Sequence, residues 1–246
     1  MRRAGRMAEP RDIVVTMCHP SVVAFGARHL DESEIRDKQV LEVGSRVVLE
    51  PELTLRHHVE ALGPSSYVGV DLEPGYGVDE ICDATRLRDR FGDESFDTVI
   101  STELLEHVRD WRSVVSNMKH VVRPGGVLLL TTRSFGFPYH AWPYDFWRCE
   151  LDDMRSIFCD FDIVELEADP QVPGVLLKAV RPEAFTEVDP SVDMYSVIRG
   201  KRVQGVSTLL WRFYSATAPL HDRYRAAVPE SLRVRLSRLA GRLTRA

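Results

Sequence analysis

Hydrophobic residues along this chain gather in short runs, and most of these runs are separated by segments long enough to form a helix. The clearest runs end in a small or acidic residue. Short apolar runs in this arrangement predict buried parallel strands that are joined by crossover helices. The seven expected strands are 39–45, 67–71, 80–82, 96–101, 127–132, 161–167 and 174–180.

Helices are expected before and between these strands, and two of them carry clear stop signals. The segment 52–62 is stopped by Gly63-Pro64, and the segment 103–122 ends just before Pro124-Gly-Gly. The alternation of strands and helices predicts an α/β architecture, a three-layer sandwich around a mostly parallel sheet. The expected helices are 20–35, 52–62, 85–91, 103–122 and 151–158.

Polar and small residues stand at the carboxyl ends of the expected strands. Glu42 and Gly44 lie in Gln-Val-Leu-Glu-Val-Gly-Ser, Asp71 ends the second strand, and Asp83 follows the third. Pro124-Gly-Gly precedes the fifth strand. In an open parallel sheet, a ligand binds beyond the carboxyl ends of the strands, where the strand order reverses. These residues are therefore the first candidates for function.

This ordered set resembles class I S-adenosylmethionine-dependent methyltransferases, and in particular the type 11 methyltransferase domain. The resemblance extends over roughly Gln39 to Val180. It implies a Rossmann-like, mostly parallel seven-stranded sheet that is closed by a pair with one antiparallel strand, and it implies S-adenosylmethionine as the cofactor. The expected cofactor-binding residues are Glu42, Gly44, Ser45, Arg46, Asp71, Leu72, Asp83, Ala84, Ser101 and Thr102.

The two strand-end acids suit different parts of this cofactor. A ribose diol is well bound by an ionised carboxylate that accepts two hydrogen bonds, and the resemblance gives this role to Asp71. Asp83 would accept a hydrogen bond from the exocyclic amine of adenine, while the Ala84 amide would donate to a ring nitrogen. Both acids also have a purely structural interpretation, Asp71 as a turn residue before Leu72 and Asp83 as the N-cap of the helix at 85–91.

The loop after the first strand departs from the family pattern. It contains the single glycine Gly44 where the family usually has Gly-x-Gly, and it continues with Ser45, Arg46 and two valines. Arg46 can either reach the carboxylate of the cofactor or pair with Glu50. The loop argues against a dinucleotide-binding dehydrogenase, which requires Gly-x-Gly-x-x-Gly after the first strand. It also motivates an alternative function, a methyltransferase-like binding protein or scaffold without catalysis.

An aromatic segment from Ser134 to Arg148 follows the fifth strand and is similar to the substrate-pocket segment of many type 11 methyltransferases. It contains His140, the first candidate for a catalytic base because histidine titrates near neutral pH, and His107 is the second candidate. The structural alternative is that Asp145 and Arg148 form an ion pair and that the aromatic residues only pack the loop. The expected substrate-binding residues are Phe137, Tyr139, Trp142, Asp145, Trp147 and Arg148.

Composition limits the other classes of function. The 246 residues include four cysteines with neither Cys-x-x-Cys nor a Cys/His spacing typical of zinc, so no metal is expected. No apolar run approaches the roughly 20 residues that span a bilayer, which favours a cytoplasmic protein. Residues 199–246 contain eleven Lys/Arg and two acids, whereas the rest of the chain contains 21 basic and 35 acidic residues. This acidic main part argues against nucleic acid as a partner.

Three regions are expected along the chain: an N-terminal extension and helix at 1–37, an S-adenosylmethionine-binding domain at 38–181, and a linker with a basic helical tail at 182–246. In the tail, leucines at helical spacing between Ser231 and Arg245 are interspersed with arginines. Such a helix can lie on an anionic membrane surface, or it can pack on its own domain or on a protein partner.

The predicted function is the transfer of a methyl group from S-adenosylmethionine to a small molecule. Oxygen is the preferred acceptor atom, and a sugar or natural-product intermediate is the candidate acceptor. The sequence leaves the oligomeric state open.

Overall fold

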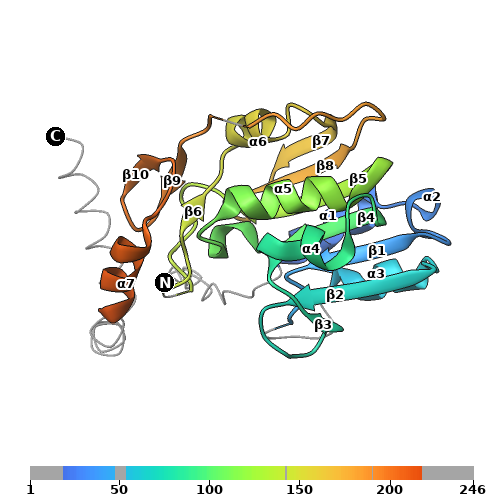
Figure 1. Ribbon diagram of the computed structural model, residues 1–246, viewed down its shortest axis with the longest axis horizontal. Helices are drawn as coiled ribbons and strands as arrows, with labels where there is room; N and C mark the ends of the chain where they lie inside the picture. The colour runs from blue at the N-terminus through green and yellow to red at the C-terminus, as the bar shows by residue number, and fades with distance from the viewer. Residues whose placement is uncertain (1–18, 48–53, 142, 190, 218–246) are drawn as a thin grey trace, which may run out of the picture.

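A seven-stranded sheet lies at the centre of the fold, with its strands in the order β3-β2-β1-β4-β5-β8-β7 (Figure 1). The computed structural model describes residues 19–47, 54–141, 143–189 and 191–217. Neighbouring strands from β3 to β5 are parallel, and β8 runs antiparallel to both β5 and β7. This order confirms the predicted Rossmann-like sheet with one antiparallel strand. The strands are β1 Gln39–Val43, β2 Ser66–Asp71, β3 Glu80–Ile81, β4 Phe96–Thr102, β5 Val122–Arg133, β7 Asp162–Ala168 and β8 Gly174–Val180.

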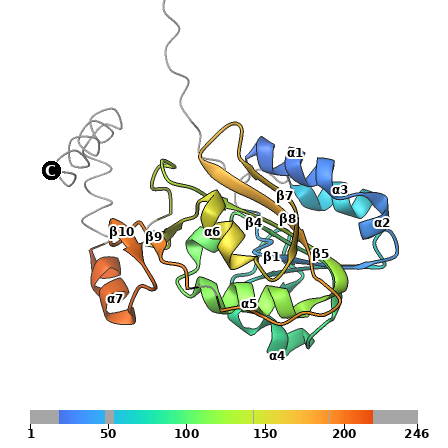
Figure 2. The ribbon, with the colours of Figure 1, turned by 90° about the horizontal axis from the view of Figure 1, so that it is seen from above.

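Helices cover both faces of the sheet (Figure 2). Side chains alternate along β1, so that Val40 belongs to the apolar cluster with α1 and α3, whereas Leu41 belongs to the cluster with α5 and α6. Burial on both faces explains why the central strands are continuous hydrophobic runs in the sequence. The helices are α1 Pro20–His29, α2 Glu32–Ile35, α3 Leu55–Ala61, α4 Leu87–Phe91, α5 Trp111–Val121 and α6 Leu151–Ile157.

The helix predicted at 20–35 is in fact two helices. The first ends at its C-cap Leu30, and Asp31 then caps α2. Asp31 and Glu34 form a reciprocal capping box, in which each side chain accepts a hydrogen bond from the other residue's backbone amide. The local hydrogen bonds of this box interrupt the helix that the hydrophobic pattern predicts.

The helix predicted at 103–122 also starts later than expected. Glu103 has a left-handed backbone conformation with φ 56°, and a short 3-10 turn follows at Leu105–His107. The helix α5 begins only at Trp111, after the N-cap Asp110. His107 therefore lies in a turn at the end of β4 and not on the long helix.

A second, smaller sheet lies beyond one end of α5 (Figure 1). Its strands are antiparallel in the order β10-β9-β6, and α7 (Thr208–Ala216) follows them in the chain. The hydrophobic pattern does not predict β9 and β10, because strands of three residues are too short to show a period. The strands are β6 Trp147–Arg148, β9 Met194–Ser196 and β10 Lys201–Val203.

The helix α7 contains the apolar segment 209–214 of the sequence. Leu209 and Phe213 are exposed, whereas Trp211 packs against the main apolar cluster. Within the described ranges, no helix has both the length and the apolar character that a transmembrane span requires. The basic helix predicted at 231–245 and the side chain of Trp142 lie outside the described residues.

Candidate functional site

A cavity of about 480 Å³ lies at the carboxyl ends of β1 and β2. One wall is formed by residues that follow the strands, among them Gly44, Asp71 and Asp83. The lining also includes His107, from the turn after β4, and Tyr144, from the loop after β5. Trp211 of α7 also lines the cavity, so the C-terminal helix contributes to this site.

Gly44 follows β1 and allows the chain to turn away from the cavity floor. Its φ of +80° lies in the left-handed region, which a side chain disfavours. A Cβ atom at this position would also lie only 3.0 Å from the Cβ of Leu104. The single glycine of this loop is therefore required by the backbone and by the packing of Leu104 alike.

Asp71 and Asp83 both face the cavity, and each also makes local hydrogen bonds. Asp71 accepts from the backbone amide of Glu73 at 3.2 Å. Asp83 accepts from the amide and the hydroxyl of Thr85, at 2.9 and 2.8 Å, and caps a short 3-10 turn. The capping role considered for Asp83 is thus present, and it leaves the carboxylate in the cavity wall. Leu72 and Ala84 lie in the same wall.

The other residues predicted to bind the cofactor do not line this cavity. Glu42 is buried and accepts a hydrogen bond of 2.7 Å from the Tyr67 hydroxyl. Burial raises the pKa of the Glu42 carboxyl to about 7, against the lowering effect of this hydrogen bond. Arg46 forms an ion pair with Glu73, and its predicted alternative partner Glu50 lies outside the described residues. The remaining three are Ser45, Ser101 and Thr102, of which the first two are buried.

Asp145 and Arg148 form a buried, two-point ion pair that holds the aromatic loop together. The nitrogen–oxygen distances are 2.5 and 2.8 Å, and the guanidinium also donates to the carbonyl groups of Phe137 and Pro138. Burial alone would raise the pKa of Asp145, but the hydrogen bonds from Arg148 and His140 outweigh it and hold this pKa below its usual range. The ion pair between Asp145 and Arg148 that the sequence analysis considered is therefore present in the structure.

The same loop supplies the cavity with different aromatic residues from those expected. Tyr144 and Phe146 line the cavity. Trp147 is buried, and its indole N–H donates to the Val108 carbonyl at 2.9 Å. Of the predicted substrate-binding residues with described side chains, none lines the cavity; these are Phe137, Tyr139, Asp145, Trp147 and Arg148.

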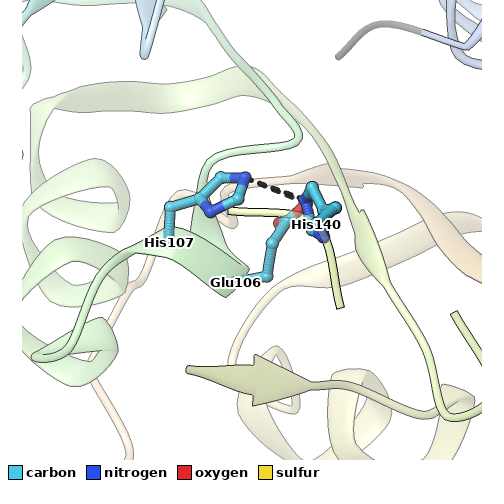
Figure 3. Close-up of side chains that lie close together, drawn as sticks. All are labelled: Glu106, His107 and His140. Atoms are coloured by element: carbon cyan, nitrogen blue, oxygen red, sulfur yellow. Dashed lines mark hydrogen bonds and ion pairs between the residues drawn. The ribbon is translucent and has the colours of Figure 1, made fainter. Parts of the chain in front are cut away.

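His107 and His140, the two predicted catalytic residues, are brought together beside Glu106 (Figure 3). Their Nε2 atoms lie 3.2 Å apart. His107 lines the cavity, whereas His140 is not part of the wall. His140 can therefore act on a bound molecule through His107. Glu106 is fully buried and accepts a hydrogen bond of 2.8 Å from Thr132.

Sequence reasoning missed several residues of the cavity wall. Leu104, Val108, Arg109 and Asp110 belong to the segment that was expected to be a continuous helix. Trp211 does have a signal in the sequence, because it lies in the apolar segment 209–214, which needs other residues to cover it. For Arg109 and Asp110 we find no signal in the sequence.

Comparison with known proteins gives a family for part of the chain. Residues 54–130 match the family model described as a methyltransferase domain, of type 11. This match confirms the resemblance predicted from the strand-end residues, and it supports S-adenosylmethionine as the cofactor. A comparison with curated protein sequences found no match.

Solved structures share the fold at low sequence identity. The 1,6-didemethyltoxoflavin-N1-methyltransferase of Burkholderia thailandensis is 16% identical, with 70% of this chain and 82% of that chain covered and a TM-score of 0.51. The cyclase SpnF is 14% identical, with 67% and 81% covered and a TM-score of 0.52. An S-adenosylmethionine-dependent methyltransferase of Mesorhizobium loti is 18% identical, with 66% and 98% covered and a TM-score of 0.49. At these identities, the similarity to the first two structures supports the fold alone.

Proposed function

We propose that this chain, whose residues 54–130 match a methyltransferase domain, transfers a methyl group from S-adenosylmethionine to a small molecule. The observation that carries the proposal is the cavity that is lined by Gly44, Asp71, Asp83 and His107. Its volume of about 480 Å³ falls within the range of roughly 300–1,000 Å³ that is typical of small-molecule sites.

The strand-end wall fits the chemistry of the cofactor. The Asp71 carboxylate would accept hydrogen bonds from the ribose diol, and Asp83 would accept one from the adenine amine. Gly44 lets its backbone approach the cofactor closely, because glycine has no side chain. A side chain at this position would also meet Leu104. When bound, the cofactor supplies an electrophilic methyl group on its sulfonium. The protein itself has to hold the acceptor in line with that methyl group.

The part of the lining around His107 fits an acceptor with an aromatic or ring-shaped body. Tyr144 and Trp211 lie there, with ring centres 6.0 Å apart, next to His107. We favour oxygen as the acceptor atom, since a hydroxyl needs a base or a metal ion to become nucleophilic and the His107–His140 pair provides nitrogen groups for either purpose. A sugar or natural-product intermediate would fit this chemistry. His140, which touches His107, would be a positioning residue in this arrangement.

A binding protein without methyl transfer is the second candidate function. The single glycine of the loop after β1 motivates it, and the [4+2]-cyclase SpnF shares the fold. This candidate predicts cofactor binding without any methylated product.

The test is the transfer of labelled methyl groups to small molecules. The full chain is incubated with methyl-radiolabelled S-adenosylmethionine and with fractions of a deproteinised small-molecule extract. Label that enters one fraction with the intact chain, and does not enter it with the Asp71→Ala variant, supports the methyltransferase. Binding of S-adenosylhomocysteine without transfer to any fraction supports the second candidate, and absence of both binding and transfer rejects the proposal.

A further inference from the structure

Three side chains that can bind a metal ion, Glu106, His107 and His140, lie close together beside the cavity (Figure 3). One oxygen of Glu106 and one ring nitrogen of each histidine all lie within 4.8 Å of one another. Glu106 and His107 come from the turn after β4, and His140 comes from the loop after β5. The loop is fixed to the turn by a backbone hydrogen bond of 2.8 Å from Phe146 to Glu106.

The separation of the two histidine nitrogens is close to that around one tetrahedral ion. Zinc–nitrogen bonds of about 2.0–2.1 Å at tetrahedral angles place two ligand nitrogens about 3.3 Å apart. The Nε2 atoms of His107 and His140 are 3.2 Å apart. The Nε2 of His107 lies 3.9 Å from Glu106 Oε1, and all three ligand atoms lie within 4.8 Å of one another, so Glu106 has to move closer to the histidines when an ion binds.

Two of the ligands, His107 and Glu106, are oriented by a hydrogen bond on their other polar atom, and the third, His140, has a carboxylate near that atom. A carbonyl can only accept, so His107 Nδ1 donates to the Tyr144 carbonyl at 2.7 Å, which leaves its Nε2 lone pair free to bind a cation. The Nδ1 of His140 lies 3.1 Å from Asp145 Oδ2. The Thr132 hydroxyl holds the other oxygen of Glu106. Carbonyl and carboxylate groups on the far nitrogen are typical partners of metal-binding histidines.

A positively charged partner near Glu106 would stabilise its buried carboxylate. Its side chain is fully buried, and among the described residues its Oε1 has no hydrogen-bond donor. A buried carboxylate oxygen without a partner is unfavourable, because it has lost its water and gained nothing in return. The buried guanidinium groups of this region pair with other carboxylates, Arg133 with Glu103 and Asp169, and Arg148 with Asp145.

We propose that Glu106, His107 and His140 bind one divalent transition-metal ion of the zinc class. Two imidazole nitrogens and one carboxylate oxygen are ligands that zinc accepts, and three protein ligands leave a fourth position for water or for a bound molecule. Because His107 also lines the cavity, this ion would lie at its edge. The two histidines then serve as ligands, and His140 is not the catalytic base that the sequence suggested. Metal binding does not require methyl transfer, so the two proposals can fail separately.

The experiment measures metal binding by the full chain after removal of bound ions with a chelator. Calorimetric titration with Zn²⁺ should show one ion per chain, and Co²⁺ should give the visible absorption of a tetrahedral or five-coordinate nitrogen–oxygen site. Glu106→Gln and His140→Ala should each weaken Zn²⁺ binding by roughly 100-fold or more. The control His57→Ala alters an exposed histidine and should bind as the wild type does.

A gentler variant covers the case in which a ligand substitution prevents folding. Thr132→Val removes only the hydroxyl that orients Glu106, and it should weaken binding by roughly 10–100-fold, the usual effect of losing an orienting partner of a ligand. No stoichiometric Zn²⁺ or Co²⁺ binding by the folded wild type would overturn the proposal and would leave a pair of histidines that share a proton. Binding that is unchanged in folded Glu106→Gln and His140→Ala would overturn it equally.

Discussion

The Nε2 atoms of His107 and His140 lie 3.2 Å apart, although the two residues are 33 positions apart in the chain. His107 follows β4 and His140 follows β5, and these two strands are parallel neighbours. The carboxyl ends of parallel neighbours lie at the same edge of the sheet, so residues just beyond them meet. Their contact connects His140 to the cavity, because only His107 of the two lines it.

Removal of the Asp71 carboxylate tests the ribose assignment. Asp71→Ala should weaken the binding of S-adenosylhomocysteine by about 1–3 kcal/mol, the scale of lost hydrogen bonds to a charged group. Calorimetric titration of the folded variant measures the effect. The control Asp152→Ala alters an acid whose side chain is 95% exposed and should leave the affinity unchanged. Wild-type affinity in the Asp71→Ala variant would contradict ribose binding by Asp71 and would leave it a structural role in the turn.

Gly44→Ala tests whether the cavity floor needs a glycine. The positive φ and the 3.0 Å approach to Leu104 should lower the free energy of unfolding by about 1–3 kcal/mol, the usual cost of a strained backbone position. Affinity for S-adenosylhomocysteine should fall as well. Gly205→Ala is the matched control, because no atom lies within 4 Å of the added Cβ and its φ is not positive. Equal stability of the two variants in chemical denaturation would speak against this role of Gly44.

The buried Glu42 predicts a specific dependence of stability on pH. Its pKa is raised to about 7 in the folded chain, so the folded state holds a proton that the unfolded state releases at lower pH. This contribution to stability is present below the unfolded pKa and is lost as pH rises to about 7. The loss approaches about 3 kcal/mol, at about 1.4 kcal/mol for each pH unit of the shift.

Glu42→Gln removes this titration and keeps an acceptor for the Tyr67 hydroxyl. Relative to the wild type, the variant should therefore gain stability between pH 5 and pH 8, as measured by denaturant unfolding at both values. Glu183→Gln, at an exposed position, should show no such gain. A pH-independent difference between Glu42→Gln and the wild type would contradict the raised pKa.

The histidine pair should matter for turnover more than for cofactor binding. His107→Ala and His140→Ala should each reduce the rate of methyl transfer by roughly 10²-fold or more, because activation of a hydroxyl depends on their shared site. Affinity for S-adenosylhomocysteine should change by less than about twofold, since the strand-end wall is intact. The double variant should be little worse than either single one, because residues in direct contact are not additive. Near-normal turnover of His140→Ala at saturating acceptor would show that His140 is not needed for methyl transfer.

The main sheet was predictable because its strands are buried on both faces. Runs such as Val127–Leu130 leave no alternative to a core strand once helix-length segments separate them. The breaks at Leu30 and Glu103 were not predictable from hydrophobicity, since local capping and a left-handed backbone position decide them. The strands β9 and β10 pair over three residues only, and such pairing depends on contacts that the sequence does not display.

The two walls of the site differ in how well the sequence predicts them. Asp71 and Asp83 follow strands, so topology alone puts them at the edge where a ligand binds. Tyr144 and Trp211 reach the same cavity from a loop and from α7, and their approach depends on tertiary packing. The Glu106 cluster could not be predicted from spacing, because it becomes a candidate metal site only when β4 and β5 bring distant residues together.

Calorimetric titration of the wild-type chain with S-adenosylhomocysteine tests directly whether the cavity binds the cofactor. We expect one bound molecule per chain and a rise in Tm with ligand concentration, since a ligand of the native state stabilises it by mass action. Absence of both heat and Tm shift with the folded protein at millimolar ligand would contradict the assignment of the cavity to S-adenosylmethionine.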